Sequence, residues 1–114
     1  MDASAKERFV RERALASLGG LSGALIWTMH AWDRLLEQGL MRRAVVQALA
    51  TCELIEDYPT TTRTLPDCLV LGLLAGNEAI HAVVAIDEAG DDIVVVTVYR
   101  PDPARWSDDF KRRR

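Results

Sequence analysis

Apolar and polar residues are patterned most clearly in the last third of the chain, where two apolar runs flank a short polar segment. The runs cover 80–86 and 93–99 and are rich in Val and Ile, and residues DEAGDD separate them. This pattern predicts a β-hairpin whose loop uses Gly90 for a positive φ. Both runs are apolar at odd and even positions, which is typical of strands covered on both faces. We therefore expect this hairpin to form the middle of a sheet.

A helix is predicted near the N-terminus, over 5–18. Its apolar residues recur at a spacing near 3.6, Lys6 falls on its polar side, and Ser4 is its expected N-cap. The short apolar segment 23–27 follows. Its pattern fits an extended segment or a buried connector, and periodicity does not distinguish the two.

Two more helices are expected before the sheet. Thr28 and Gly39 have the residue types of an N-cap and a C-terminal stop, and they bound a helix over 29–38. A third helix is expected over 41–51. We assign the buried face of the middle helix to Trp32, Leu35 and Leu36.

Two further strands are expected over 52–57 and 67–73, with a polar loop over 60–66 between them. The predicted fold class is α+β, with N-terminal helices packed on a four-stranded, largely antiparallel sheet. Trp106 and Phe110 are too large to leave in solvent, so we expect the tail to pack back on the body. The chain is read as a single domain, 1–114, divided into the N-terminal helix 1–22, helices within 23–51, the sheet 52–99 and a basic tail 100–114.

Composition limits the possible function classes. With 49% hydrophobic and 27% charged residues the chain is globular, and a net charge of −3 argues against a dedicated, sequence-independent nucleic-acid binder. No apolar run has the length of a membrane span, so we expect no membrane association and a cytoplasmic location. Cys52 and Cys68 are interpreted as reduced core thiols. No cofactor or metal motif is found, and we expect neither group.

The tail is basic, although the chain as a whole is acidic. Residues 100–114 carry six Lys or Arg against three Asp, a local balance of +3. Arg100 and Arg112 within it are candidate contacts for RNA or phosphate. The alternative is a solvated terminus without a binding role.

Four residues are candidates for acid–base chemistry or for binding a phosphate: His30, Arg34, His81 and Tyr99. Histidine exchanges protons near neutral pH, and arginine stabilises phosphate charge. A histidine or tyrosine in an apolar strand is, however, also common as a structural residue.

Arg42 and Arg43 lie in the first turn of the third predicted helix, where positive charge opposes the helix dipole. An anion held there by both arginines would explain this placement. The alternative is that both side chains point into water, where the penalty is small.

Several stretches resemble the bacterial domain-of-unknown-function family 4258. They are MHAWDRLLEQGL (29–40), ELIEDYP (53–59), CLVLG (68–72), IHAVVAI (80–86) and VVVTVYRPDPARWSDDFKRRR (94–114). The resemblance implies a fold similar to that of RelE-like toxins, which are small ribonucleases of toxin–antitoxin pairs. By position His30, Arg34, His81 and Tyr99 match family motifs. Gln38 stands where an Arg is common in the family, and this departure weakens the ribonuclease interpretation.

Two functional hypotheses follow. The first, implied by the resemblance, is a toxin-like endoribonuclease that contacts RNA or the ribosome and pairs with a small antitoxin-like protein. In it His30, His81 or Tyr99 moves protons, and Arg34 and Arg100 stabilise the phosphate. The second is a non-catalytic protein-interaction module on the same fold, in one version a homodimer.

Overall fold

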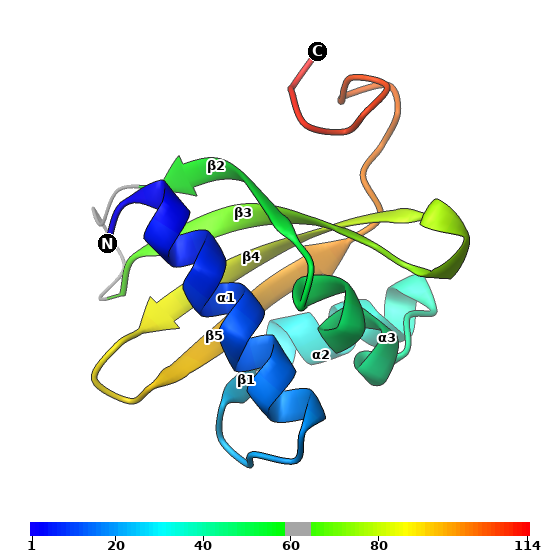
Figure 1. Ribbon diagram of the computed structural model, residues 1–114. Coiled ribbons are helices and arrows are strands. Elements are labelled where there is room, and N and C mark those ends of the chain that lie inside the picture. The colour runs from blue at the N-terminus through cyan, green and yellow to red at the C-terminus, as the bar shows by residue number, and fades with distance from the viewer. Residues whose placement is uncertain (59–64) are drawn as a thin grey trace.

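The computed structural model describes residues 1–58 and 65–114 and shows an α+β fold (Figure 1). Most of the predicted loop over 60–66 lies outside the described residues. Within them, helices and strands follow the order α1 (Ala3–Leu18), β1 (Leu25–Trp27), α2 (Met29–Gln38), α3 (Arg42–Leu49), β2 (Glu53–Tyr58), β3 (Asp67–Leu73), a short 3₁₀ turn (Ala75–Asn77), β4 (Ala79–Asp87) and β5 (Asp92–Tyr99).

The strands form one five-stranded mixed sheet in the order β1-β5-β4-β3-β2. Strands β2 to β5 are an antiparallel meander, as expected, and the predicted hairpin occupies interior positions of the sheet. The expectation of four strands is wrong, because β1 pairs in parallel with β5 and Leu25 aligns with Ile93. Segment 23–27 therefore contains a strand rather than belonging to the helices. Three residues are too few to show an alternating pattern, so the pairing partner decides their conformation.

One face of the sheet carries the main core. Side chains from β3, β4 and β5, such as Val70, Val84 and Val95, form one buried cluster with Val10 of α1 and Leu49 of α3. Helices α1 and α3 also pack against each other. Gly72 of β3 allows α3 to come this close, because a Cβ at Gly72 would lie 2.9 Å from the Cβ of Ala48.

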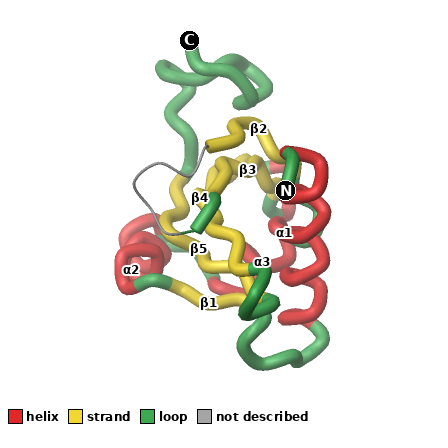
Figure 2. Tube along the Cα trace, turned by 90° about the vertical axis from the view of Figure 1, so that its left-hand side faces the viewer, coloured by secondary structure: helices red, strands yellow, loops and turns green. Residues whose placement is uncertain are grey.

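Helix α2 lies beside β5, beyond the end of the short strand β1 (Figure 2). Thr28 is its N-cap, as predicted, and accepts a hydrogen bond from the Ala31 backbone N–H. The Thr28 hydroxyl also donates to the Val96 carbonyl at 2.9 Å, which fixes the helix start to β5. Gly39 ends the helix in the left-handed conformation, with φ of 63°.

Two local predictions, one of a helix cap and one of a turn residue, are wrong. The N-cap of α1 is Asp2 rather than Ser4, and its carboxylate accepts from the Ala5 N–H. Both residue types are good caps, and the helix begins two residues earlier than predicted. In the hairpin loop the positive φ falls on Asp91, at 54°, and not on Gly90. Aspartate tolerates this conformation better than most residues.

Lys6 is buried, although the helix pattern placed it on the polar side of α1. Its ammonium pairs with the carboxylate of Asp57 and donates to the carbonyls of Tyr58 and Asp67 at 3.3 and 3.2 Å. The long apolar stem of lysine permits burial once the charged end has partners. Lys6 thus joins the first helix to β2 and β3.

Candidate functional site

His81, the central candidate from the sequence, is completely buried. Its Nε2 lies 2.8 Å from the carbonyl oxygen of Phe110, and its Nδ1 lies 3.3 Å from the hydroxyl of Tyr99. A carbonyl only accepts, so Nε2 carries the proton and Nδ1 accepts from Tyr99. The Trp106 ring packs edge-on against the imidazole, with centroids 4.4 Å apart. Both ring nitrogens of His81 are therefore occupied by the protein itself.

The C-terminal tail covers His81. It leaves the sheet after Tyr99 and folds above β2, at one end of the molecule (Figures 1 and 2). The Arg113 guanidinium donates two hydrogen bonds to Glu56, at 2.9 and 3.0 Å, and lies over the Trp106 ring. The Glu56 carboxylate also accepts from the Tyr58 hydroxyl at 2.6 Å. These groups from β2, β4, β5 and the tail form one connected polar and aromatic cluster, which we call the His81 cluster.

The titration behaviour of the His81 cluster follows from burial and pairing. Burial lowers the pKa of His81 below its usual value, and burial raises the pKa of Tyr99. Hydrogen bonds from Arg113 lower the pKa of Glu56, and burial raises the pKa of Tyr58 to about 12. At neutral pH the cluster thus holds a neutral imidazole, two neutral phenols and one carboxylate–guanidinium pair.

We expect the domain to lose stability as the pH falls through the His81 transition. The pKa of His81 is lower in the folded state than its ordinary value of 6.5, so the unfolded chain binds the proton more strongly. The stabilisation is complete above about pH 6.5 and is lost as the pH falls through the folded pKa. An NMR titration of the His81 ring should give a midpoint below 6.5, and a midpoint at or above 6.5 would contradict this burial argument.

His30 and Arg34 are on the surface, on α2. His30 is exposed, and its Nε2 lies 3.1 Å from the Thr97 hydroxyl. Thr97 and Tyr99 are two residues apart on β5, so their side chains share one face of the sheet. Arg34 pairs with Glu37 of its own helix at 2.6 Å. The structure thus brings His81 and Tyr99 into contact. His30 and Arg34 lie on the neighbouring helix, where His30 contacts Thr97 and Arg34 pairs with Glu37.

The arginines predicted to bind phosphate are at three separate places. Arg100 forms an ion pair with Glu78 and donates a hydrogen bond to the Gln38 carbonyl, so its charge is neutralised within the protein. The side chain of Arg112 makes no hydrogen bond or ion pair within 1–58 and 65–114. The rest of the tail is largely neutralised, because Lys111, Arg113 and Arg114 pair with Glu53, Glu56 and Asp108. Arg42 and Arg43 begin α3, far along the chain from the tail.

An exposed apolar surface was missed by the sequence analysis. Trp32 and Leu36 were assigned to the buried face of α2, but they are 41% and 74% exposed. Met29 shares their side of the helix, because residues three and seven apart align, and it is 77% exposed. Helix α2 carries two apolar stripes, and this feature of the sequence could have revealed the exposed one. Ala31 and Leu35 form the stripe that is buried.

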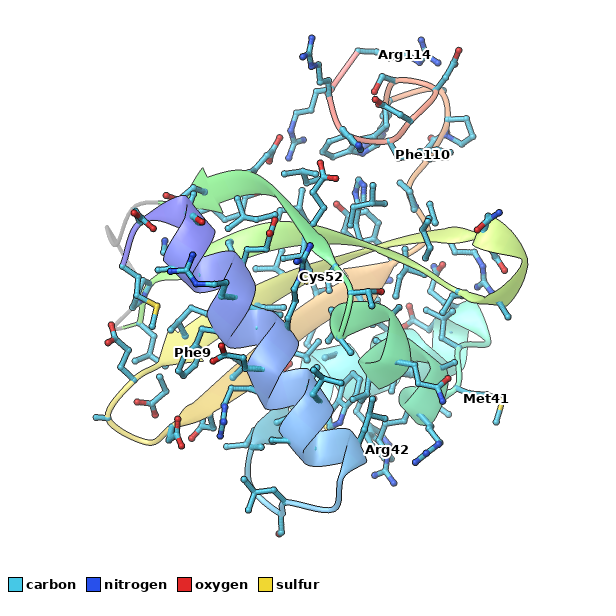
Figure 3. The ribbon with its side chains drawn as sticks, in the orientation of Figure 1. Phe9, Met41, Arg42, Cys52, Phe110 and Arg114 are labelled. Atoms are coloured by element: carbon cyan, nitrogen blue, oxygen red, sulfur yellow. The ribbon has the colours of Figure 1, made fainter. Side chains whose placement is uncertain are left out.

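This exposed surface continues onto the start of α3. Met41 is 74% exposed, and the guanidinium of Arg42 lies over the Trp32 ring, 5.5 Å from its centroid. Figure 3 shows Met41 and Arg42 on the same side of the molecule, remote from Phe110 and Arg114 in the tail. We call the surface formed by Met29, Trp32, Leu36 and Met41 the α2–α3 surface.

Neither a metal cluster nor a reactive thiol is found in the described part of the chain. No three His, Cys, Asp or Glu side chains among these residues are grouped so as to hold a metal ion. Cys52 and Cys68 are buried free thiols, and burial raises the pKa of each to about 12. Among the described residues, no helix is long and apolar enough to cross a membrane.

Comparison with known proteins identifies a family. The family model "Domain of unknown function (DUF4258)" matches residues 27–100, from the end of β1 to the start of the tail. No curated protein and no solved structure gives a significant match. The match covers more than half of the chain and includes α2, α3 and the antiparallel meander. The chain therefore belongs to the DUF4258 family.

Proposed function

We propose that this domain binds a protein partner through the α2–α3 surface. The observation that carries the proposal is the exposure of Met29, Leu36 and Met41, each about three-quarters exposed, around the half-exposed Trp32. Isolated apolar residues are common on protein surfaces, but adjacent ones of this size mark interaction sites. Methionine and tryptophan are also the residue types enriched in the centres of interfaces.

The charges beside this surface indicate the chemistry of the partner. Within the described residues, Arg42 and Arg43 have no carboxylate partner. The Arg42 guanidinium stacks over the Trp32 ring and places a positive charge beside it. An amphipathic helix with apolar residues at i, i+3 and i+7 and with flanking carboxylates would satisfy both features. A second copy of this chain fits less well, because a twofold interface here would bring the arginines of both copies together. The small antitoxin-like protein expected from the family resemblance is one partner of this type.

The position of His81 argues against its use as a catalytic acid or base. A general acid or base must reach the reacting proton, directly or through one water. His81 is buried beneath Trp106, and its two nitrogens are hydrogen bonded to Tyr99 and Phe110. Its contacts are those of a structural residue that holds the tail to the sheet.

The proposal is tested with a synthetic helical peptide whose apolar stripe is Leu at i, i+3 and i+7 and whose flanks are Glu. Fluorescence anisotropy should show saturable binding of this peptide to the domain. Trp32→Ser should weaken binding by about tenfold or more, since a buried aromatic anchor contributes at least about 1.4 kcal/mol.

Two controls make the test specific. Leu15→Ser changes an exposed leucine on α1 and should leave binding unchanged. A peptide with Lys in place of Glu should bind much more weakly. Equal binding of the Glu and Lys peptides, or of the Trp32→Ser and Leu15→Ser proteins, would contradict the proposal. Self-association of the domain, abolished by Trp32→Ser, would instead identify a second copy as the occupant.

A second candidate function is cleavage of RNA by a toxin-like domain. The observation that favours it is the exposed imidazole of His30 beside Thr97, on the face of β5 that also carries Tyr99. In such a reaction His30 would remove the proton of a ribose 2′-OH, whose oxygen attacks the adjacent phosphorus. The bond from phosphorus to the 5′-oxygen would then break, and an acid such as Tyr99 would protonate the leaving oxygen.

Induced expression in a bacterial host tests this second candidate. Growth and RNA integrity are followed for the original protein and for His30→Ala/Arg34→Ala. Growth arrest with RNA loss, relieved in the double variant, would establish a ribonuclease and assign its site to α2. Intact RNA with normal growth, from soluble folded protein, would leave the binding function as the one supported.

A further inference from the structure

A cavity of about 490 Å³ lies between the end of α1, strand β1 and the start of α3. No residue of the tail or of the His81 cluster lines it. Its walls combine apolar side chains with charged ones, including Leu25, Trp27, Val46, Arg42 and Arg43. This volume lies within the range of sites that hold small organic molecules.

The cavity is electropositive. Of the residues that the structure describes, two arginines and no Asp or Glu line it. Within the described residues, Arg43 has no ion pair, hydrogen bond or ring contact, and the Arg42 guanidinium contacts the Trp32 ring but no carboxylate. Guanidinium groups bind phosphate through paired hydrogen bonds, so two arginines among the lining residues favour an anionic ligand.

The loop after α1 adds further donors. Ser22 and Gly23 line the cavity, and their backbone N–H groups make no hydrogen bond within the described residues. Gly23 has a φ of 86°, and a Cβ there would meet no atom within 4 Å. The loop therefore borders open space and keeps unused donors at the edge of the cavity.

We infer that this cavity binds a small organic phosphate whose body is flat and apolar. The phosphate would be held by Arg43 together with Arg42, and the body would lie against Trp27 and the aliphatic wall of Leu25 and Val46. This inference shares Arg42 and Arg43 with the proposed protein-binding function but not its aromatic anchor, because Trp32 does not line the cavity.

Isothermal titration with adenosine monophosphate, adenosine and inorganic phosphate tests the inference. Adenosine monophosphate should bind with a Kd below about 1 mM, and the other two should bind at least about tenfold more weakly. Arg43→Gln should weaken binding of the monophosphate by about tenfold. Arg105→Gln, in the tail, is the matched control and should leave the Kd unchanged.

Several outcomes would overturn the inference. The first is the absence of binding of adenosine monophosphate at about 10 mM, tenfold above the upper limit expected for its Kd. The second is an affinity for adenosine, or for inorganic phosphate, equal to that for adenosine monophosphate. An unchanged Kd in Arg43→Gln would also overturn it, provided that circular dichroism shows the variant to be folded. Loss of peptide binding in Trp32→Ser with unchanged binding of the monophosphate would keep the two proposals separate.

Discussion

Replacing Trp106 by alanine is expected to destabilise the domain by about 3–5 kcal/mol, the usual cost of truncating a large buried aromatic side chain. Trp106 is 4% exposed, although it lies only eight residues before Arg114. Its ring packs against the His81 imidazole. The Arg113 guanidinium lies over the same ring, 4.8 Å from the ring centroid of Trp106. Removing the ring would also open His81 to water. The midpoint of urea unfolding measures the change.

Trp32→Ala is the matched control for Trp106→Ala. It removes the same number of atoms from a side chain that is 41% exposed, so we expect a loss of about 1 kcal/mol or less. If both variants lost the same stability, the tail would not be an integral part of the fold. A preserved urea midpoint in Trp106→Ala would lead to the same conclusion.

Substituting valine for Gly72 is expected to cost about 2–3 kcal/mol, although valine has a high intrinsic preference for strands. The reason is the close contact between β3 and α3. A Cβ at position 72 would lie 2.9 Å from the Cβ of Ala48 and 3.2 Å from its carbonyl oxygen. Neither atom belongs to a flexible side chain, so the helix itself must move away. Thermal and urea unfolding both report the loss.

Leu73→Val is the control for this second substitution. Leu73 is the next residue of β3 and is 52% exposed, so valine there should change stability by less than about 0.5 kcal/mol. A double variant that combines Gly72→Val with Ala48→Gly should recover part of the loss, because it removes the clashing methyl group. Failure of Gly72→Val to destabilise would show that α3 does not pack tightly on β3.

The sheet was predictable from sequence where its pattern is long. Strands β4 and β5 are apolar at odd and even positions, and this property correctly placed them inside the sheet. Strand β1 was not predictable in this way, because Leu25–Trp27 is too short to carry a period. Its conformation is set by hydrogen bonds to β5, such as the one from the Ile93 N–H to the Ala24 carbonyl at 3.0 Å.

The candidate site was less predictable than the fold. The residue types at His81 and Tyr99 gave no information on whether these side chains are buried. Their burial depends on the tail, which returns to the sheet about thirty residues after His81. The outward stripe of α2 was misassigned for a related reason. A helix with apolar residues on two sides has no single buried face in its sequence, and the neighbouring strand decides which side is covered.

The three tryptophans permit one direct measurement of the central claim, that the α2–α3 surface binds a partner. Trp27 lines the cavity, Trp32 lies on the α2–α3 surface, and Trp106 belongs to the tail and packs on His81, so each indole N–H reports on a different place. The Glu-flanked peptide would be titrated into ¹⁵N-labelled protein, with the indole signals assigned from single-tryptophan substitutions. We expect a progressive shift of the Trp32 indole signal while the signals of Trp27 and Trp106 stay in place. A stationary Trp32 signal, or a shift confined to Trp106, would contradict the claim.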